Sequence, residues 1–138
     1  MSTTFELRPI GGVRSPIRTR EEAPKQGDEG APEAWLDLNA SVAAAAADLR
    51  VGQEVIVLTW LDRADRTVLA VHPRDDESRP LSGVFSTRSQ DRPNPIGLHR
   101  LTLLEIAAGP RLRVSGLEAF DGTPVLDIKP ALDSTRER

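Results

Sequence analysis

The stretch Leu98-His-Arg-Leu-Thr-Leu-Leu-Glu-Ile106, with Ala107-Ala-Gly-Pro110 and Arg111-Leu-Arg-Val114 after it, decides the fold class. The first segment is mostly apolar and predicts a strand, and the Gly-Pro pair predicts a tight turn. Leu112 and Val114 then alternate with arginines, as they do in a strand that buries one face. The whole stretch therefore predicts a β-hairpin.

Further short apolar runs lie on both sides of this hairpin. Val55–Leu61 is apolar on both faces, which predicts a central strand or an interface strand. Trp35–Leu38 predicts a short strand, and Val125–Lys129 predicts another after the turn signal Asp121-Gly-Thr-Pro. Many short strands separated by turns are typical of an all-β barrel or sandwich.

One short helix and one edge strand complete the N-terminal half. The alanine run Ala43–Ala47 predicts the helix, which Asn39 or Ser41 would cap. Phe5–Val13 predicts a first strand, interrupted by Pro9 and therefore at a sheet edge.

Three expectations concern detail inside the sheet. Thr67–Val71 predicts a return strand that forms a hairpin with Val55–Leu61. Trp60 and Phe85 are expected in the core. Strict alternation along the last strand would place Leu126 and Ile128 on one face, and Val125, Asp127 and Lys129 on the other.

Length and composition restrict the classes of protein to consider. With 138 residues the chain predicts one domain, residues 1–138, with a frayed tail at 133–138. We expect no membrane span, because no run of about 18 apolar residues occurs. We also expect no secretory signal, because the first residues lack a basic flank that leads into an apolar core. The absence of cysteine is compatible with a cytoplasmic location, which we predict. Without cysteine or closely spaced histidines, we expect no metal site, and His72 and His99 are expected to be structural or solvent-facing.

The segment Ser82–His99 concentrates residues that ordinary folding does not require. Arg88 and Arg92 lie on a loop in which Pro93 and Pro95 restrain the backbone. Two planar guanidinium groups on a stiff loop suit an anionic or polar planar ligand, although a structural turn with solvated arginines is the simpler alternative. Residues 79–100 hold four arginines and one acid, a net charge of +3, so the rest of the chain carries −6. This distribution favours a defined anionic site over general polyanion binding.

Two long motifs carry a resemblance to a known family. Gly83-Val-Phe-Ser-Thr-Arg-Ser-Gln-Asp-Arg-Pro-Asn-Pro-Ile-Gly-Leu98 and Asp121-Gly-Thr-Pro-Val-Leu-Asp-Ile-Lys-Pro130 closely resemble the signatures of the TsaA-like family, and Pro9–Pro16 resembles its start. Characterised members are S-adenosylmethionine-dependent methyltransferases that act on N6-threonylcarbamoyladenosine next to the anticodon of tRNA. The resemblance implies a small β-barrel that is distinct from the Rossmann-like methyltransferases and works as a homodimer. With the alanine run, the predicted fold class is all-β, a small β-barrel with one short Ala-rich helix.

The resemblance also implies which residues bind the cofactor S-adenosylmethionine. The matching positions here are Gln26, Gly27, Asp28, Leu61, Asp62, Arg88, Leu98, Thr123, Pro124, Val125 and Leu126. Relatives commonly have histidine where Asp62 stands, and Gln-Pro-Gly where this chain has Gln26-Gly27-Asp28. Longer relatives carry a further C-terminal domain.

Roles within the site follow from side-chain chemistry. Arg88 is expected to hold the cofactor carboxylate, with a surface ion pair as the alternative. Arg92, Asn94 and Lys129 are the predicted substrate contacts, although Arg92 would equally brace the loop. Asp127 is the candidate general base for the N6 proton, or the partner of a simple ion pair with Lys129.

The function predicted from the sequence is methyl transfer to threonylcarbamoyladenosine in tRNA. One alternative keeps the cofactor but methylates a small molecule or another RNA. Another is an S-adenosylmethionine-binding module without turnover. We expect no membrane partner.

Overall fold

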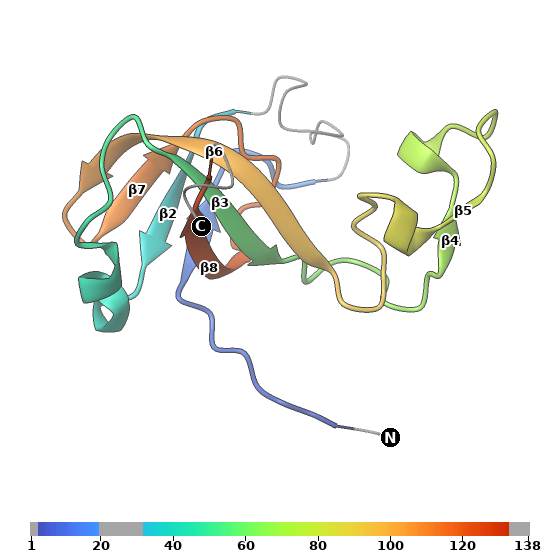
Figure 1. Cartoon of the computed structure of the whole chain (residues 1–138), viewed down its shortest axis with the longest axis horizontal. Helices are drawn as coiled ribbons and strands as arrows, with labels where there is room; N and C mark the ends of the chain where they lie inside the picture. Colours follow the sequence, from blue (N-terminus) through green and yellow to red (C-terminus); the bar gives the residue numbers. More distant parts are fainter. Residues whose placement is uncertain (1–2, 20–31, 133–138) are drawn as a thin grey trace.

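Six antiparallel strands form a closed barrel in a computed structural model that describes residues 3–19 and 32–132 (Figure 1). Their order around the barrel is β1-β2-β7-β6-β3-β8. The strands are β1 (Gly11–Arg14), β2 (Ala34–Leu38), β3 (Glu54–Trp60), β6 (Ile96–Ala107), β7 (Arg111–Val114) and β8 (Pro124–Pro130). The predicted all-β barrel is confirmed, as are the hairpin β6–β7 and its turn. A closed antiparallel barrel is unrelated to the parallel, doubly wound Rossmann sheet.

The barrel interior is filled by inward-facing side chains from all six strands. In β3 the alternation is regular, with Val55, Val57 and Thr59 buried and the residues between them half-buried. Leu117 and Ala119, from the segment between β7 and β8, join the same core. Alternation between interior and exterior is what a small barrel packed with side chains requires.

The alanine-rich segment forms a 3₁₀ helix, η3 (Ala40–Ala46), slightly earlier than the sequence predicts. Asn39 precedes the helix without capping it, because its Nδ2 donates instead to the carbonyl of Pro9 at 3.1 Å. Val42 and Ala46 pack against the barrel core. The predicted helix is present, but the predicted Asn39 cap is wrong.

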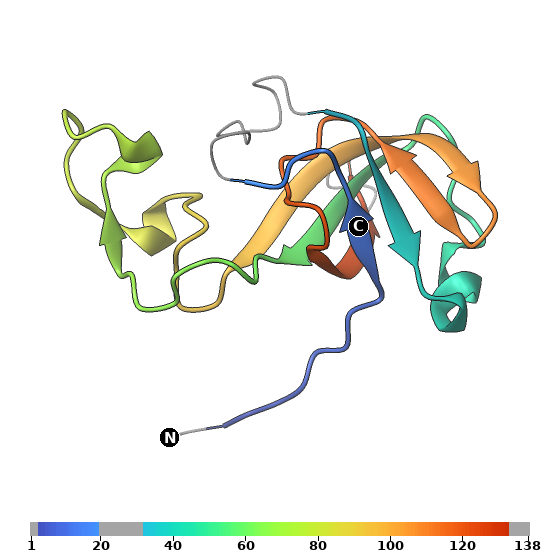
Figure 2. The same ribbon diagram turned by 180° about the vertical axis from the view of Figure 1, so that it is seen from behind.

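The predicted strand Phe5–Val13 is wrong for most of its length. β1 begins only at Gly11, and the residues from position 3 to Pro9 extend away from the barrel (Figures 1 and 2). At Gly11 the backbone of β2 comes so close that a Cβ atom would overlap the carbonyl oxygen of Asp37. Pairing therefore starts where a glycine permits the approach.

Between β3 and β6 the chain leaves the barrel and forms a projection, residues 61–95, which we call the arm (Figure 2). The arm contains a small sheet of β4 (Ala70–Val71) and β5 (Ser82–Gly83), and two short 3₁₀ turns, η4 (Pro73–Asp75) and η5 (Val84–Ser86). The predicted hairpin between Thr67–Val71 and β3 is wrong, because β6 and β8 already pair with both edges of β3.

A β-bulge changes which residues of β8 face the core. Thr59 lies opposite Val125, whereas Leu58 lies opposite Asp127, so the register skips Leu126. Val125 is fully buried and Ile128 also packs on the core, so the predicted separation of these two residues is wrong. The extra residue in the bulge shifts the alternation by one position.

Two further findings concern the described residues. No helix among residues 3–19 and 32–132 is long and apolar enough to cross a membrane. Within the same residues, no cluster of three or more His, Asp or Glu side chains is arranged to hold a metal ion.

Candidate functional site

One row across three strands carries two of the predicted site residues. Leu58 of β3 lies opposite Leu98 of β6 on one side and opposite Asp127 of β8 on the other. Residues directly opposite each other in antiparallel strands project from the same face of the sheet. The structure therefore places Leu98, the predicted cofactor contact, and Asp127, the predicted base, on the outer face of the barrel, one on each side of Leu58.

The outer surface around this row is apolar. Trp60 lies opposite Ile96, next to the pair Leu58 and Leu98. Ile96 and Leu98 are 42% and 47% exposed, respectively. We call Leu58, Trp60, Ile96 and Leu98 the apolar face. A group of exposed apolar side chains on a folded domain marks a surface that binds a ligand or another protein.

The outer surface of β1, β2 and β7 is polar instead. The carboxylate of Asp37 accepts hydrogen bonds from Arg111 Nε at 2.6 Å and from Arg14 Nε at 3.0 Å. The hydrogen bond from Arg111, with a smaller contribution from Arg14, holds the pKa of Asp37 below its usual range. Partial burial of the carboxylate opposes this effect without cancelling it. A second group places Arg113 between Glu33 at 2.7 Å and Glu105 at 3.1 Å. Charged side chains thus cover this side, and the candidate site lies on the other.

Asp127 and Lys129 form the ion pair that the sequence offered as the simpler alternative. Lys129 Nζ lies 3.2 Å from Asp127 Oδ2, and the backbone N–H of Ile128 donates to Asp127 Oδ1 at 2.9 Å. The Asp127 side chain is nevertheless 49% exposed. A substrate on the outer face has access to this carboxylate.

Leu61 and Asp62 lie at the base of the arm, directly after β3. The backbone N–H of Leu61 donates to the carbonyl of Pro95 at 2.8 Å, which holds the two ends of the arm together. Leu61 is half-buried and Asp62 is exposed. The hydrogen bond places Leu61, and with it the neighbouring Asp62, beside the start of β6. This strand begins at Ile96, two residues before Leu98.

The four residues of the predicted segment Thr123–Leu126 alternate between the barrel interior and its outer surface. The carbonyl of Thr123 accepts from Val13 at 2.9 Å, and that of Val125 accepts from Ile10 at 2.8 Å. Thr123 and Val125 also bury their side chains. Pro124 and Leu126 are half-buried, and Leu126 is the residue that the register with β3 skips. A bulge residue has backbone groups outside the strand ladder, so Leu126 is the best placed of the four to bind a polar ligand edge.

Arg88 lies on the arm, in the segment between η5 and β6. Its side chain is exposed and forms no hydrogen bond or ion pair with residues 3–19 and 32–132. The alternative of a surface ion pair is thus not seen in the described part of the protein. A guanidinium group that none of the described residues engages is suited to an anionic ligand.

Arg92 and Asn94, both predicted substrate contacts, are engaged within the arm. Arg92 Nη2 donates to the carbonyl oxygens of Val84 and, at 2.8 Å, Thr87, so Arg92 braces the loop. Asn94 is exposed, and its Oδ1 accepts from Arg66 Nη2 at 2.9 Å. The bracing alternative for Arg92 has direct structural support.

Arg66 connects the arm to the barrel and was not singled out from the sequence. Its guanidinium also donates from Nε to the carbonyl of Pro93 at 2.7 Å, and it lies 5.1 Å from the ring centre of Trp60 on β3.

The three predicted contacts Gln26, Gly27 and Asp28 lie outside the residues that the structure describes.

A buried polar group also went unrecognised in the sequence. His99 Nε2 lies 2.8 Å from Thr59 Oγ1, and His99 Nδ1 lies 2.9 Å from Glu118 Oε1. Alternation along the two strands does place Thr59 and His99 on inward faces. The strand register that brings them together is not visible in the sequence.

Comparison with known proteins identifies the family. The family model for the tRNA-methyltransferase O N-terminal domain matches residues 12–135. The chain belongs to this family. A probable S-adenosyl-L-methionine-binding protein of Methanothermobacter thermautotrophicus is 47% identical over 91% of this chain and 89% of its own length. An S-adenosyl-L-methionine-binding protein of Archaeoglobus fulgidus is 43% identical over 95% of this chain and 94% of its own.

Solved structures of TrmO share the fold. The crystal structure of TrmO from Pseudomonas aeruginosa is 32% identical with a TM-score of 0.74, and the match covers all of this chain. The chain spans 61% of the length of that TrmO chain. The predicted TsaA-like family membership is therefore confirmed.

Proposed function

We propose that this protein binds S-adenosylmethionine at the outer face of β3, β6 and β8, and that it methylates N6 of threonylcarbamoyladenosine beside the anticodon of tRNA. The observation that carries the proposal is the family match over residues 12–135. Two relatives of similar length are named for binding this cofactor. With tRNA as its substrate, the protein would act in the cytoplasm.

The residues at the outer face have the chemistry that the cofactor needs. The side chains of Leu58 and Leu98 offer an apolar surface for the adenine ring. The bulge at Leu126 leaves backbone groups for the polar edge of that ring. Arg88 supplies a guanidinium group for a bidentate pair with the cofactor carboxylate.

When bound, the cofactor supplies an electrophilic methyl group on its sulfonium. Methyl transfer from sulfonium to nitrogen is an in-line displacement, for which holding both reactants in position supplies much of the acceleration. In this proposal Asp127 accepts the proton that N6 loses, which is supported by its half-exposed carboxylate on the same face as Leu98. Lys129 lies beside it and is suited to a phosphate of the RNA.

Calorimetry with S-adenosylmethionine tests the cofactor site. We expect saturable binding by the wild-type protein and a loss of about tenfold or more in affinity for Arg88→Ala, since one charge-assisted pair contributes roughly 1.5–3 kcal/mol. Arg50→Ala, which removes another exposed arginine, is the matched control and should bind normally. Equal binding by Arg88→Ala and the wild type would remove Arg88 from the site.

Mass spectrometry of nucleosides tests the reaction. tRNA from a strain that lacks the methyl modification is incubated with protein and cofactor, then digested. We expect threonylcarbamoyladenosine to gain one methyl group, and we expect Asp127→Asn to slow this gain. If the cofactor binds but threonylcarbamoyladenosine gains no methyl group, this nucleoside is not the substrate. A small molecule or another RNA would then be favoured as the acceptor.

A binding module without turnover is the second candidate. One observation favours it. The two relatives that match over nearly their whole length are named as binding proteins, whereas the match to TrmO covers only 61% of that chain. Tight cofactor binding with no methyl transfer to any RNA fraction would support it.

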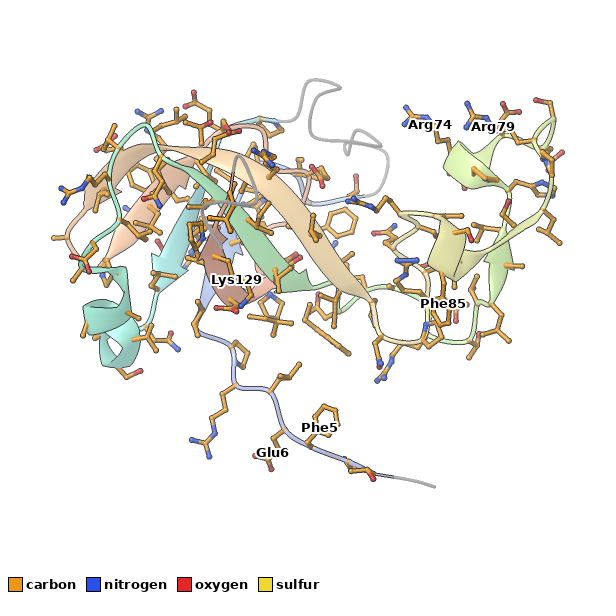
Figure 3. All side chains as sticks on the ribbon, in the orientation of Figure 1. Phe5, Glu6, Arg74, Arg79, Phe85 and Lys129 are labelled. Carbon is orange, nitrogen blue, oxygen red and sulfur yellow. The ribbon has the colours of Figure 1, made fainter. Side chains whose placement is uncertain are left out.

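We also propose a homodimer. Ile96 and Leu98 of the apolar face are exposed on the barrel, and Leu69, Leu81 and Phe85 are exposed on the arm. Phe85 is 85% exposed, so its predicted core position is wrong. It lies on the arm, well away from Lys129 on the barrel (Figure 3). A second copy of the chain would cover these surfaces, and light scattering at micromolar concentration should give twice the monomer mass.

A further inference from the structure

The polar group inside the barrel has no part in the proposed reaction so far. Thr59 is fully buried and His99 is 5% exposed. Burying polar side chains costs free energy unless each one has a hydrogen-bond partner. Here Thr59, His99 and Glu118 satisfy one another in a chain of two hydrogen bonds, of 2.8 and 2.9 Å.

The chemistry of the three groups determines which atom donates in each of the two hydrogen bonds. The carboxylate of Glu118 only accepts hydrogen bonds, so Nδ1 of His99 carries the proton and donates to it. In the neutral ring Nε2 is then the acceptor, and the hydroxyl of Thr59 donates to it. Hydrogen bonds on both nitrogens fix the orientation of the ring.

Each member of this group adjoins a different segment of the proposed cofactor site. Thr59 precedes Leu61 by two residues, and its neighbours across the strands are Gly97 of β6 and Val125 of β8. His99 follows Leu98 directly. Glu118 precedes Thr123 by five residues, in the segment that leads into β8. The two hydrogen bonds therefore link three of the segments that carry or precede proposed contacts.

Gly97 leaves room for this arrangement. A Cβ atom at position 97 would overlap the Thr59 hydroxyl and lie 2.7 Å from His99 Nε2. Real Cβ atoms do not approach other atoms so closely, so a side chain here would displace the hydrogen bond. The space is thus occupied by a polar contact beside the apolar core cluster of the barrel.

We infer that Thr59, His99 and Glu118 are positioning residues for the S-adenosylmethionine site. By joining β3, β6 and the segment before β8 from inside the barrel, they hold Leu61, Leu98 and Leu126 in the relative positions that cofactor binding requires. Thr59 and His99 act through the strands, because both are buried beneath the outer face. This inference rests on the proposed function.

Two substitutions at position 59 separate positioning from stability. Thr59→Val keeps the shape of the side chain and loses the hydroxyl, whereas Thr59→Ser keeps the hydroxyl and loses a methyl group. Val114→Ala creates a cavity in the same core on β7, away from the site, and serves as the stability control. For each variant, calorimetry gives the affinity for S-adenosylmethionine and thermal unfolding gives the Tm.

We expect Thr59→Val to bind the cofactor about tenfold more weakly or worse, because small misplacements of a site are costly. Thr59→Ser should bind within about threefold of the wild type, and Val114→Ala should bind normally with a lower Tm. Affinity that follows the Tm across all three variants would overturn the positioning role and leave the proposed function intact. A wild-type protein that does not bind the cofactor would overturn both. If Thr59→Val fails to fold, Glu118→Ala is measured in its place. It removes the acceptor of the His99 Nδ1–H at a partly exposed residue, with the same expected loss of affinity and the same outcomes.

Discussion

Arg88 and Arg92 belong to the same basic segment, yet only Arg92 is held by the backbone of the arm. Its guanidinium bonds to the carbonyl oxygens of Val84 and Thr87, and its Nε is buried without a partner among the described residues. Arg88 is exposed. Residue type and spacing predicted two guanidinium groups for an anionic or polar ligand. The surroundings of Arg92 show that it braces the loop, whereas the binding of a ligand by Arg88 stays a prediction.

This difference predicts unequal effects of the two substitutions on stability. Arg92→Met should lower the free energy of unfolding by about 1–3 kcal/mol, because two carbonyl groups lose their donor. Arg88→Met should change it by less than about 0.5 kcal/mol, as expected for an exposed side chain. Urea unfolding followed by fluorescence of the two tryptophans measures both. Similar losses for the two variants would contradict the assignment.

At Gly97 the prediction concerns a single added methyl group. Gly97→Ala should destabilise the barrel by about 1–3 kcal/mol, the usual cost of overpacking, because the new Cβ would overlap the Thr59 hydroxyl. Gly12→Ala is a control in the same barrel, since the nearest atom to its Cβ would be at 4.0 Å. Thermal unfolding should show a loss in Tm for position 97 that clearly exceeds the loss for position 12.

Among the elements, β2 is held between two neighbours by its Asp37. Arg14 of β1 and Arg111 of β7 both donate to this carboxylate, and Arg111 also lies 4.6 Å from the ring centre of Trp35. Because the pKa of Asp37 is lowered in the folded protein, the ionised carboxylate stabilises the fold. That contribution is complete above the ordinary aspartate pKa of about 3.9. It disappears as the pH falls through the lower pKa of the folded state.

Asp37→Asn should therefore lose stability only where the carboxylate is ionised. At pH 7 the expected loss is below about 1 kcal/mol, since water screens this partly exposed pair. The difference in unfolding free energy between wild type and variant should shrink towards zero as the pH falls below about 4. A difference that stays constant down to the lowest pH would show that the charge is not responsible.

The elements also show what sequence patterns can predict. β2, β3, β6, β7 and β8 lie within a few residues of their predicted positions, because periodicity and turn residues act locally. The bulge at Leu126 and the short pair β4–β5 depend on which strands meet, and the sequence does not contain that information in readable form. The same holds for the site: Leu98 and Asp127 come together through the register with Leu58.

For the whole molecule, the proposed homodimer makes Phe85 an interface residue. Phe85→Ser should shift the protein towards monomer in sedimentation velocity at micromolar concentration, because a buried aromatic side chain contributes strongly to association. Phe5→Ser removes another exposed phenylalanine, from the N-terminal segment seen in Figure 3, and is the control. A wild-type protein that is already monomeric at this concentration would rule out the dimer.

The arm also divides the molecule into a barrel and an insertion. β3 and β6 are antiparallel neighbours, so residues 61–95 are, topologically, a long hairpin loop. Replacing them with a four-residue turn should leave a folded barrel with the same core. Circular dichroism and a cooperative unfolding transition would test this, and loss of cofactor binding is expected because Arg88 is removed.

The length of that loop has a consequence for how fast the barrel forms. Pairing β3 with β6 requires closing a loop of 35 residues, and loop-closure entropy rises by about 0.6 kcal/mol for each doubling of length. Relative to a four-residue turn, the arm adds roughly 2 kcal/mol to this step. If the two strands pair in the folding transition state, the native chain should fold more than tenfold more slowly than its shortened form. The projection that carries Arg88 would then set the time that a newly made chain spends with its strands unpaired.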